Sequence, residues 1–439
     1  MRQSCKNLPP HLLTRIWHLA WPLMLANASA PLLGLVDTGL MGRQPDSTAL
    51  AAVAIGANLF GLVAWGFNLL TMATSGSTAW IMGESGLAAA GHWLRRLSLW
   101  VLATGLLLVA MSPWLIPLGL RFYDPSVAVA DAITTYLGVR VWSAPLVLLN
   151  LLLAGWFIGV QRTRVNLNAM LCAQLVNILV SVFLVFGLGL GVAGVAFGSV
   201  MGDLSAFFVY SLSAWRLLNN RLSTVSHRVI PNISHYLTLA LPLLVRTLTL
   251  LFAFNYFARL GLGLGQDVVA ANALLLTFLL VVSSLIDGFA NAAEALVGQA
   301  AGARDRTRAQ QAIIATGLWS FSAALVLSAV FAVAHPALIA LLTDLPAIRE
   351  LAGQYAIWMI LMPLYTWWAY WLDGVFIGLQ WVRAMRNVLL LTVFGVYWPL
   401  SLILPMNDNH QIWALFAFMM ALRSVIMLAL VYQRWQRIT

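Results

Sequence analysis

The chain has 439 residues, of which 62% are hydrophobic and 9% are charged, and its mean hydropathy is +0.88. Ordinary soluble domains carry about 25% charged residues, so this composition excludes a soluble protein and indicates one that is embedded in a membrane. A formal net charge of +10 could suggest a nucleic-acid partner, but the positions of the basic residues favour an explanation by membrane topology.

Apolar stretches recur along the whole chain, and about 20 consecutive apolar residues are enough to span a bilayer as a helix. We therefore predict an all-α polytopic membrane protein with twelve transmembrane helices. They cover residues 16–41, 50–80, 96–119, 133–159, 166–187, 192–215, 236–259, 268–300, 312–334, 352–379, 387–404 and 411–433.

The basic residues are distributed unevenly between the two sides that these spans define. Seventeen lie on the side of the two termini, and only Arg43, Arg121, Arg259 and Arg349 lie on the other. Positive residues are enriched in cytoplasmic loops, so both termini should be cytoplasmic, in a bacterial inner membrane. The net charge then reflects topology, and no nucleic-acid partner is expected.

One peptide pattern occurs twice, half a chain apart. The pattern Gly-x-Phe-Ile-Gly-x-Gln-x-x-Arg-x-x-x-Asn begins at Gly155 and again at Gly374, 219 residues later. Gln, Arg and Asn are scarce in this chain, so their shared spacing indicates an internal duplication. The motif falls on cytoplasmic loops, where we expect it to fix a turn.

The duplication predicts how the chain divides. Six spans in each copy is an even number, so the halves should be parallel repeats, that is, two six-helix bundles related by an axis along the membrane normal. We expect an N-lobe at residues 1–215, a cytoplasmic linker at 216–235 and a C-lobe at 236–439.

Equivalent spans of the two halves carry interior prolines, namely Pro22, Pro31, Pro145, Pro242 and Pro363. Proline removes a backbone donor and bends a helix. For Pro22 and Pro31, in the first span, a hinge role and a purely structural role are both open.

Ionisable groups within spans are costly, and each is a candidate for function. The acidic candidates are Asp37, Asp203, Asp287, Glu294 and Asp373, and the basic candidates are Arg140, Arg246 and Arg423. Asp37 is the most informative of these residues. The equivalent position in the second half falls near Phe257, so the duplication does not explain why an acid is present at position 37. Burial favours the neutral form of a carboxyl group, so Asp37 could take up and release a proton.

A second group of acids lies in the C-terminal half. Asp287 and Glu294 are seven residues apart and share one helix face. Asp373 precedes the repeated motif, where the first half has only Ala154. These three acids could form a functional polar patch, or a structural network that includes Arg246.

The sequence contains no histidine or cysteine cluster at metal-ligand spacing, no nucleophilic triad and no phosphate-binding glycine loop. We therefore expect neither an enzyme nor an ATP-driven pump, and no metal or cofactor.

Four segments resemble the MATE (multidrug and toxic compound extrusion) family, and the branch that they resemble most is the DNA-damage-inducible one. The segments run from Pro22 through Asp37 to Gly42, from Asn177 to Gly194, from Asp287 to Asp305, and from Leu372 to Gly378.

The resemblance implies two six-helix lobes around a central cleft, which opens to each side of the membrane in turn. A proton or sodium gradient would drive export of small amphipathic, often cationic, drug-like compounds. We expect the protein to work as a monomer. The family's N-lobe cation site maps onto Asp37, Asn177 and Ser199. At Ser181 the family has an acid, and this departure favours proton coupling over sodium.

We therefore expect a proton-coupled efflux antiporter with Asp37 as the proton carrier. One alternative is a lipid-linked oligosaccharide flippase of the same superfamily, which should line its cavity with several arginines, whereas Arg140, Arg246 and Arg423 are few and scattered. A membrane-embedded enzyme is the other alternative, although the chain lacks a metal or nucleophile constellation.

Overall fold

The computed structural model describes residues 9–41, 47–219 and 232–435, and the side chains of residues 29–39 lie outside the described part. Helices make up the regular secondary structure of the described residues, which contain no strand. Nine of these described helices are long and apolar enough to cross a membrane. The chain is thus an all-helical, multi-pass membrane protein.

The chain divides into two compact units. One, here called the N-terminal unit, comprises residues 25–236, and the other, the C-terminal unit, comprises residues 1–24 together with 237–439. The first helix, α2 (Pro10–Met41), contributes its first part to the C-terminal unit and the remainder to the N-terminal unit.

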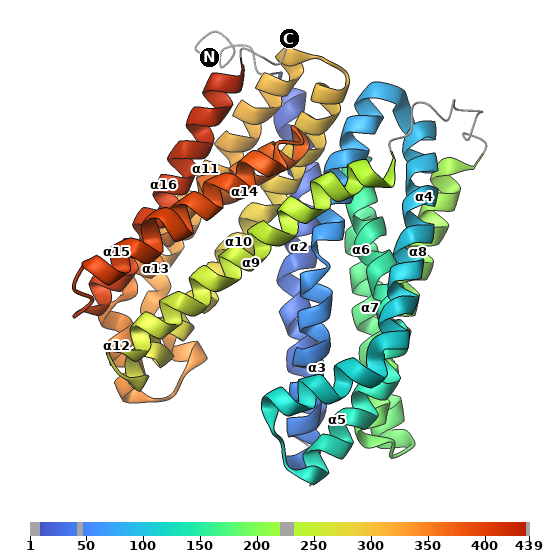
Figure 1. The fold of residues 1–439 in the computed structure, drawn as a ribbon, viewed down its shortest axis with the longest axis vertical. Coiled ribbons are helices and arrows are strands. Elements are labelled where there is room, and N and C mark those ends of the chain that lie inside the picture. Colours follow the sequence, from blue (N-terminus) through green and yellow to red (C-terminus); the bar gives the residue numbers. More distant parts are fainter. Residues whose placement is uncertain (1–8, 42–46, 220–231, 436–439) are drawn as a thin grey trace. The chain divides into compact units, whose positions relative to one another are not determined.

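The N-terminal unit is built from a run of helices joined by short connections (Figure 1). After α2 these are α3 (Ser47–Gly66), α4 (Leu69–Tyr123), α5 (Val127–Arg140), the 3₁₀ turn η1 (Val141–Ser143), α6 (Ala144–Gly159), α7 (Thr163–Val182), the π-helical turn η2 (Phe183–Gly187) and α8 (Gly191–Leu218). Gly86 interrupts α4 with φ 78° and ψ −171°, so this 55-residue run is two helices that meet at a kink. Helix α4 packs against α6, and α7 packs against α8.

The C-terminal unit is also built from long helices (Figure 1). Its elements are α9 (Ile233–Leu262), α10 (Gln266–Gly302), α11 (Arg306–Leu342), α12 (Pro346–Gln354), α13 (Ala356–Gly378), α14 (Val382–Leu390), the π-helical η4 (Leu391–Tyr397), α15 (Trp398–Ile403) and α16 (Asn409–Trp435). Helix α10 packs against α11 and α13, and α13 also packs against α16.

The glycines of the repeated motif are packing residues. A Cβ atom on Gly155 would lie 2.4 Å from the carbonyl oxygen of Thr71 in α4, and one on Gly374 would lie 2.1 Å from that of Ala290 in α10. Small residues let two helix backbones approach this closely. The same peptide therefore brings together α4 with α6 in one unit and α10 with α13 in the other.

The glutamine of the motif occupies a tight turn in both copies. Gln161 has φ 60° and Gln380 has φ 57°. The backbone N–H of Gln161 donates to the carbonyl of Ile158 at 2.9 Å, and that of Gln380 donates to Ile377 at 2.9 Å. These left-handed residues end α6 and α13. The structure thus shows the turn that the motif predicts.

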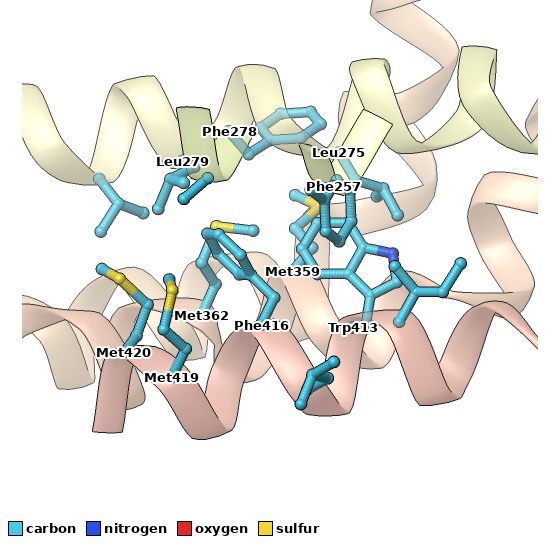
Figure 2. Packing of buried hydrophobic residues seen from close by; sticks show 14 of the residues in the cluster. Phe257, Leu275, Phe278, Leu279, Met359, Met362, Trp413, Phe416, Met419 and Met420 are labelled. Atoms are coloured by element: carbon cyan, nitrogen blue, oxygen red, sulfur yellow. The ribbon is translucent and has the colours of Figure 1, made fainter. Parts of the chain in front are cut away.

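The core of the C-terminal unit is rich in aromatic and methionine side chains (Figure 2). Phe257 contacts Trp413 and Phe416 edge-on, with ring centroids 4.7 and 5.3 Å apart. Met359 and Met419 lie beside these rings and are fully buried. Flexible thioethers fill the irregular spaces that rings leave, so this packing fixes α9, α13 and α16 relative to one another.

The prolines have different local consequences. The backbone of α2 stays helical through Pro22 and Pro31; Pro22 is buried, and the side chain of Pro31 lies outside the described residues. Their hinge role therefore stays a prediction. Pro145, in contrast, is the second residue of α6, just after the 3₁₀ turn η1 that separates α5 from α6 within the predicted fourth span.

Candidate functional site

Asp37 lies in the last part of α2, which continues to Met41. Its side chain falls outside the described residues, so its role as proton carrier stays a prediction.

The other residues predicted for the N-lobe site come together between α7 and α8. The Asn177 side chain donates through Nδ2 to Ser199 Oγ at 3.1 Å and accepts at Oδ1 from Ser181 Oγ at 3.2 Å. All three side chains are buried. We call them the α7–α8 polar cluster.

Glycines on α8 allow this close approach. Gly198 and Gly202 are one helical turn apart and face α7. A Cβ on Gly198 would lie 1.9 Å from Ser181 Oγ, and one on Gly202 would lie 2.8 Å from the carbonyl of Ala173. Any larger residue would separate the helices and break the hydrogen bonds of the cluster.

The chemistry of the α7–α8 polar cluster is neutral. The amide of Asn177 uses its oxygen to accept from one serine and its nitrogen to donate to the other. The residue one helical turn after Asn177 is Ser181, which carries no charge. These groups can orient a partner by hydrogen bonds, but a negative charge has to come from another helix.

Two partly buried charges in the described part of the N-terminal unit neutralise each other. Arg140 forms an ion pair with Asp203 and donates to Ser143 Oγ. Its guanidinium also lies 4.2 Å from the centroid of the Phe60 ring. These contacts hold Arg140 from several sides, so Asp203 serves to neutralise it.

The C-terminal unit contains a second charged group, here called the arginine–aspartate cluster, consisting of Arg246, Asp287, Asp373 and Arg423. One carboxylate oxygen of Asp373 accepts from Arg246 and the other accepts from Arg423. These three side chains are almost fully buried, with exposed fractions of 5% for Asp373, 6% for Arg246 and 0% for Arg423. A single carboxylate thus serves two guanidinium groups from α9 and α16.

Asp287 is the most exposed member of the cluster. It interacts electrostatically with Arg246 and Asp373, but it forms no ion pair with any residue in the described ranges. Glu294 lies two turns further along α10, is buried, and has its backbone packed against Gly378. The predicted group therefore contains the Arg246–Asp373 contact, with Asp287 close by, and the functional role of each residue stays a prediction.

Two features were missed by reasoning from the sequence. Arg423 was named as an intramembrane charge, but its pairing with Asp373 was not foreseen; the rule that buried charges pair could have suggested it. The buried amides of Asn272 and Asn409 were also missed. They exchange two hydrogen bonds of 2.8 Å, and the indole of Trp413 donates to Asn272 at 2.8 Å.

Among the side chains that the structure describes, which leave out Asp37, no three His, Cys, Asp or Glu residues are grouped so that they could hold a metal ion.

Comparison with known proteins places this architecture in a family. The family profile MatE matches residues 22–183 and 242–403, one segment in each half of the chain. The DNA damage-inducible protein F of Escherichia coli K12 is 34% identical over 96% of this chain and 92% of that protein.

Two further comparisons agree with this one. A probable multidrug resistance protein NorM of Pasteurella multocida is 25% identical over 67% of this chain and 65% of that protein. A solved structure described as the outward-facing conformation of a multidrug resistance MATE family transporter has a TM-score of 0.82 at 18% identity, covering 98% of this chain and 97% of that one. At that identity the likeness concerns the fold alone. The match in both halves and the full-length similarity to the E. coli protein show that the chain belongs to the MatE family of membrane transporters.

Proposed function

We propose that this protein is a secondary active transporter that exchanges protons for small amphipathic, often cationic, organic compounds and expels them from the cell. The proposal depends on one observation, namely that the α7–α8 polar cluster buries three hydrogen-bonding side chains and carries no charge. A proton or cation bound in this half needs a carboxylate, and Asp203 is already paired with Arg140. Within the predicted spans of this half, Asp37 on α2 is the acid that remains for this task.

The neutral cluster favours protons over sodium. A sodium ion keeps its charge and needs several oxygen ligands, as hard cations do. The amide oxygen of Asn177 already accepts a hydrogen bond from Ser181. A proton needs only one carboxylate, and its binding to Asp37 removes a charge from α2, which carries Pro22 and Pro31. We infer that α2 bends there and reshapes the N-lobe.

The proposed topology has twelve crossings, with both termini in the cytoplasm, and two six-helix lobes that alternate access. The kink at Gly86 supports this arrangement, because it divides the 55-residue α4 between the second and third crossings. The first part of α4, together with α3, then makes one crossing, and the second part makes the next.

The test is a flux assay with purified protein in liposomes. An outward-driven fluorescent cationic dye is followed under an imposed proton gradient and, separately, under a sodium gradient. Proton-driven flux is expected, and the Asp37→Asn variant should lose at least tenfold of it while inserting normally into the membrane. As a matched control, Asp305→Asn removes an acid from the exposed start of α11 and should keep wild-type flux. Unchanged proton-driven flux in Asp37→Asn would refute the assignment.

A further inference from the structure

The N-terminal unit contains a groove that the proposed transport mechanism does not use. It has a volume of about 470 Å³ and is lined by α4, after the kink at Gly86, by α6 and by α8 (Figure 1). Helix α6 packs against both α4 and α8, whereas α4 and α8 make little contact with each other. The lining residues of α6, Leu149 and Leu153, are buried. Helix α6 is thus the floor of the groove, and α4 and α8 are its walls.

The wall that α4 contributes is polar at one end and apolar at the other. Its lining residues include His92, Arg95 and Ser98, followed by Leu99 and Leu102. Residues three and four apart on a helix share one face, so this face changes from basic to apolar along the chain. Arg95 is exposed, whereas Nε2 of His92 is buried, so Arg95 presents the charge. None of the described residues that line the groove is acidic.

The length of the groove matches one leaflet of a bilayer. Its lining on α4 runs from His92 to Leu102, and ten residues of helix advance about 15 Å at 1.5 Å per residue. The hydrocarbon core of a bilayer is about 30 Å thick, so one leaflet contributes about 15 Å. A single acyl chain that enters at the polar end can therefore follow the groove over the depth of its own leaflet.

The surroundings of the groove indicate the source of such a chain. Leu99 and Leu102 are exposed, so the apolar part opens to the lipid around the protein. Arg95 lies on the side of the chain that carries most of the basic residues, which is the cytoplasmic side in the proposed topology. Anionic phospholipids are enriched there, and basic pockets between transmembrane helices on that side bind their head groups.

We propose that this groove binds one phospholipid with an anionic head group from the cytoplasmic leaflet. The guanidinium of Arg95 binds the phosphate of the head group, and one acyl chain lies along Leu99 and Leu102 over the floor that α6 provides. A free phosphate has a matching charge but would leave the apolar part of the groove unfilled. The site does not depend on the proposed transport activity, and it takes from the proposed topology only the choice of leaflet.

The experiment compares two lipids with identical acyl chains and different head groups. Full-length protein in detergent is incubated with an equimolar mixture of phosphatidylglycerol, which is anionic, and phosphatidylcholine, which is zwitterionic. Native mass spectrometry distinguishes the two lipids by mass and gives the affinity of the first one bound. A parallel sample contains an excess of glycerol phosphate, which has the charged head group without the chains.

The wild type should prefer phosphatidylglycerol about fivefold, the factor expected from one arginine beside an anionic lipid. Arg95→Gln should remove this preference, and because Arg95 is exposed the variant should fold. The control Arg308→Gln removes an exposed arginine of α11 and should keep the preference.

Two further variants test whether the chain lies in the groove. Ser98→Phe places a ring in the groove from α4, and Ser211→Phe does so from α8, so the test does not depend on the folding of one variant. Each should weaken the binding of both lipids at least fivefold.

Equal affinities of the two lipids for the wild type would overturn the proposal, as would a preference that survives Arg95→Gln. Loss of the preference in Arg308→Gln would also overturn it, because general surface charge would then select the lipid. Unchanged lipid binding in a folded Ser98→Phe or Ser211→Phe variant would show that the lipid lies elsewhere. Displacement of phosphatidylglycerol by glycerol phosphate would show that the site takes a free anion. Lipid binding as described in a protein without proton-driven flux would support this inference and remove the proposed function alone.

Discussion

Asp373 should be the most sensitive charged position in the C-terminal unit. The Asp373→Asn substitution keeps the size of the side chain but removes the negative charge that Arg246 and Arg423 share. Removal of one partner from a buried ion pair costs about 3–5 kcal/mol, because the other charge is left uncompensated. Here two buried guanidinium groups lose their partner at once, so we expect a cost at the upper end of this range. Proteins have about 5–15 kcal/mol of stability in total, so this substitution should remove a large part of it and lower the melting temperature strongly.

The measurement is thermal unfolding in detergent, followed by the loss of the monodisperse peak in size-exclusion chromatography. Asp305→Asn is the control, because Asp305 caps α11 at a more exposed place, and Asn caps a helix about as well as Asp, so the cost should be below about 1 kcal/mol. In the double variant Asp373→Asn/Arg423→Gln one of the two uncompensated charges is gone, so part of the stability should return. The reasoning is wrong if Asp373→Asn melts with the wild type, or if the double variant is less stable than the single one.

Two other substitutions test the packing and the polar core by the same thermal assay. Gly374→Ala places a methyl group 2.1 Å from the backbone oxygen of Ala290 and should destabilise the protein by roughly 1–3 kcal/mol. Gly138→Ala is its control, because open space surrounds Gly138 in α5, and this variant should be neutral or stabilising. Equal effects of the two substitutions would contradict the packing argument. Asn272→Ala leaves the amide of Asn409 and the indole N–H of Trp413 without their partner and should cost roughly 2–4 kcal/mol of stability. Adding Asn409→Ala to this variant should cost little more. Additive losses would show that the two amides act independently.

The helical membrane class and the turn at the repeated motif could be predicted from the sequence because both depend on local information. Apolar length predicts a spanning helix. The spacing of scarce residues around Gln161 and Gln380 predicts a shared turn, and both residues adopt the left-handed conformation. The kink at Gly86 lies between the predicted second and third spans, at residues 50–80 and 96–119. The 3₁₀ turn before α6 lies inside the predicted fourth span, where Pro145 predicts a bend but not the turn itself.

Contacts between helices could be predicted less well. The sequence singles out Asp373 and Arg246 as costly charges, but any of three arginines could pair with any of several acids. Only the packing of α13 against α16 shows that Arg423 is the second partner of Asp373. The α7–α8 polar cluster was grouped through a family resemblance, and the glycines that bring its helices together gave no signal of their own.

The two halves carry different charges at nearly equivalent positions, so the duplication alone does not identify the functional residues. Asp203 and Arg423 are 220 residues apart, close to the step of the repeated motif, yet their charges are opposite. Asp203 pairs with Arg140 from the predicted fourth span, and Arg423 pairs with Asp373 from the predicted tenth, which is its counterpart. The partners of these two residues do not occupy equivalent positions, because Asp373 corresponds to Ala154 and not to Arg140. Each half thus neutralises its charge with a residue of its own, whereas a packing glycine such as Gly155 or Gly374 has no substitute that fits. A duplicated membrane protein can therefore keep its packing motif in both copies while its charges diverge. A charge present in only one half, as Asp37 is, is therefore predicted to have a role that the two copies do not share.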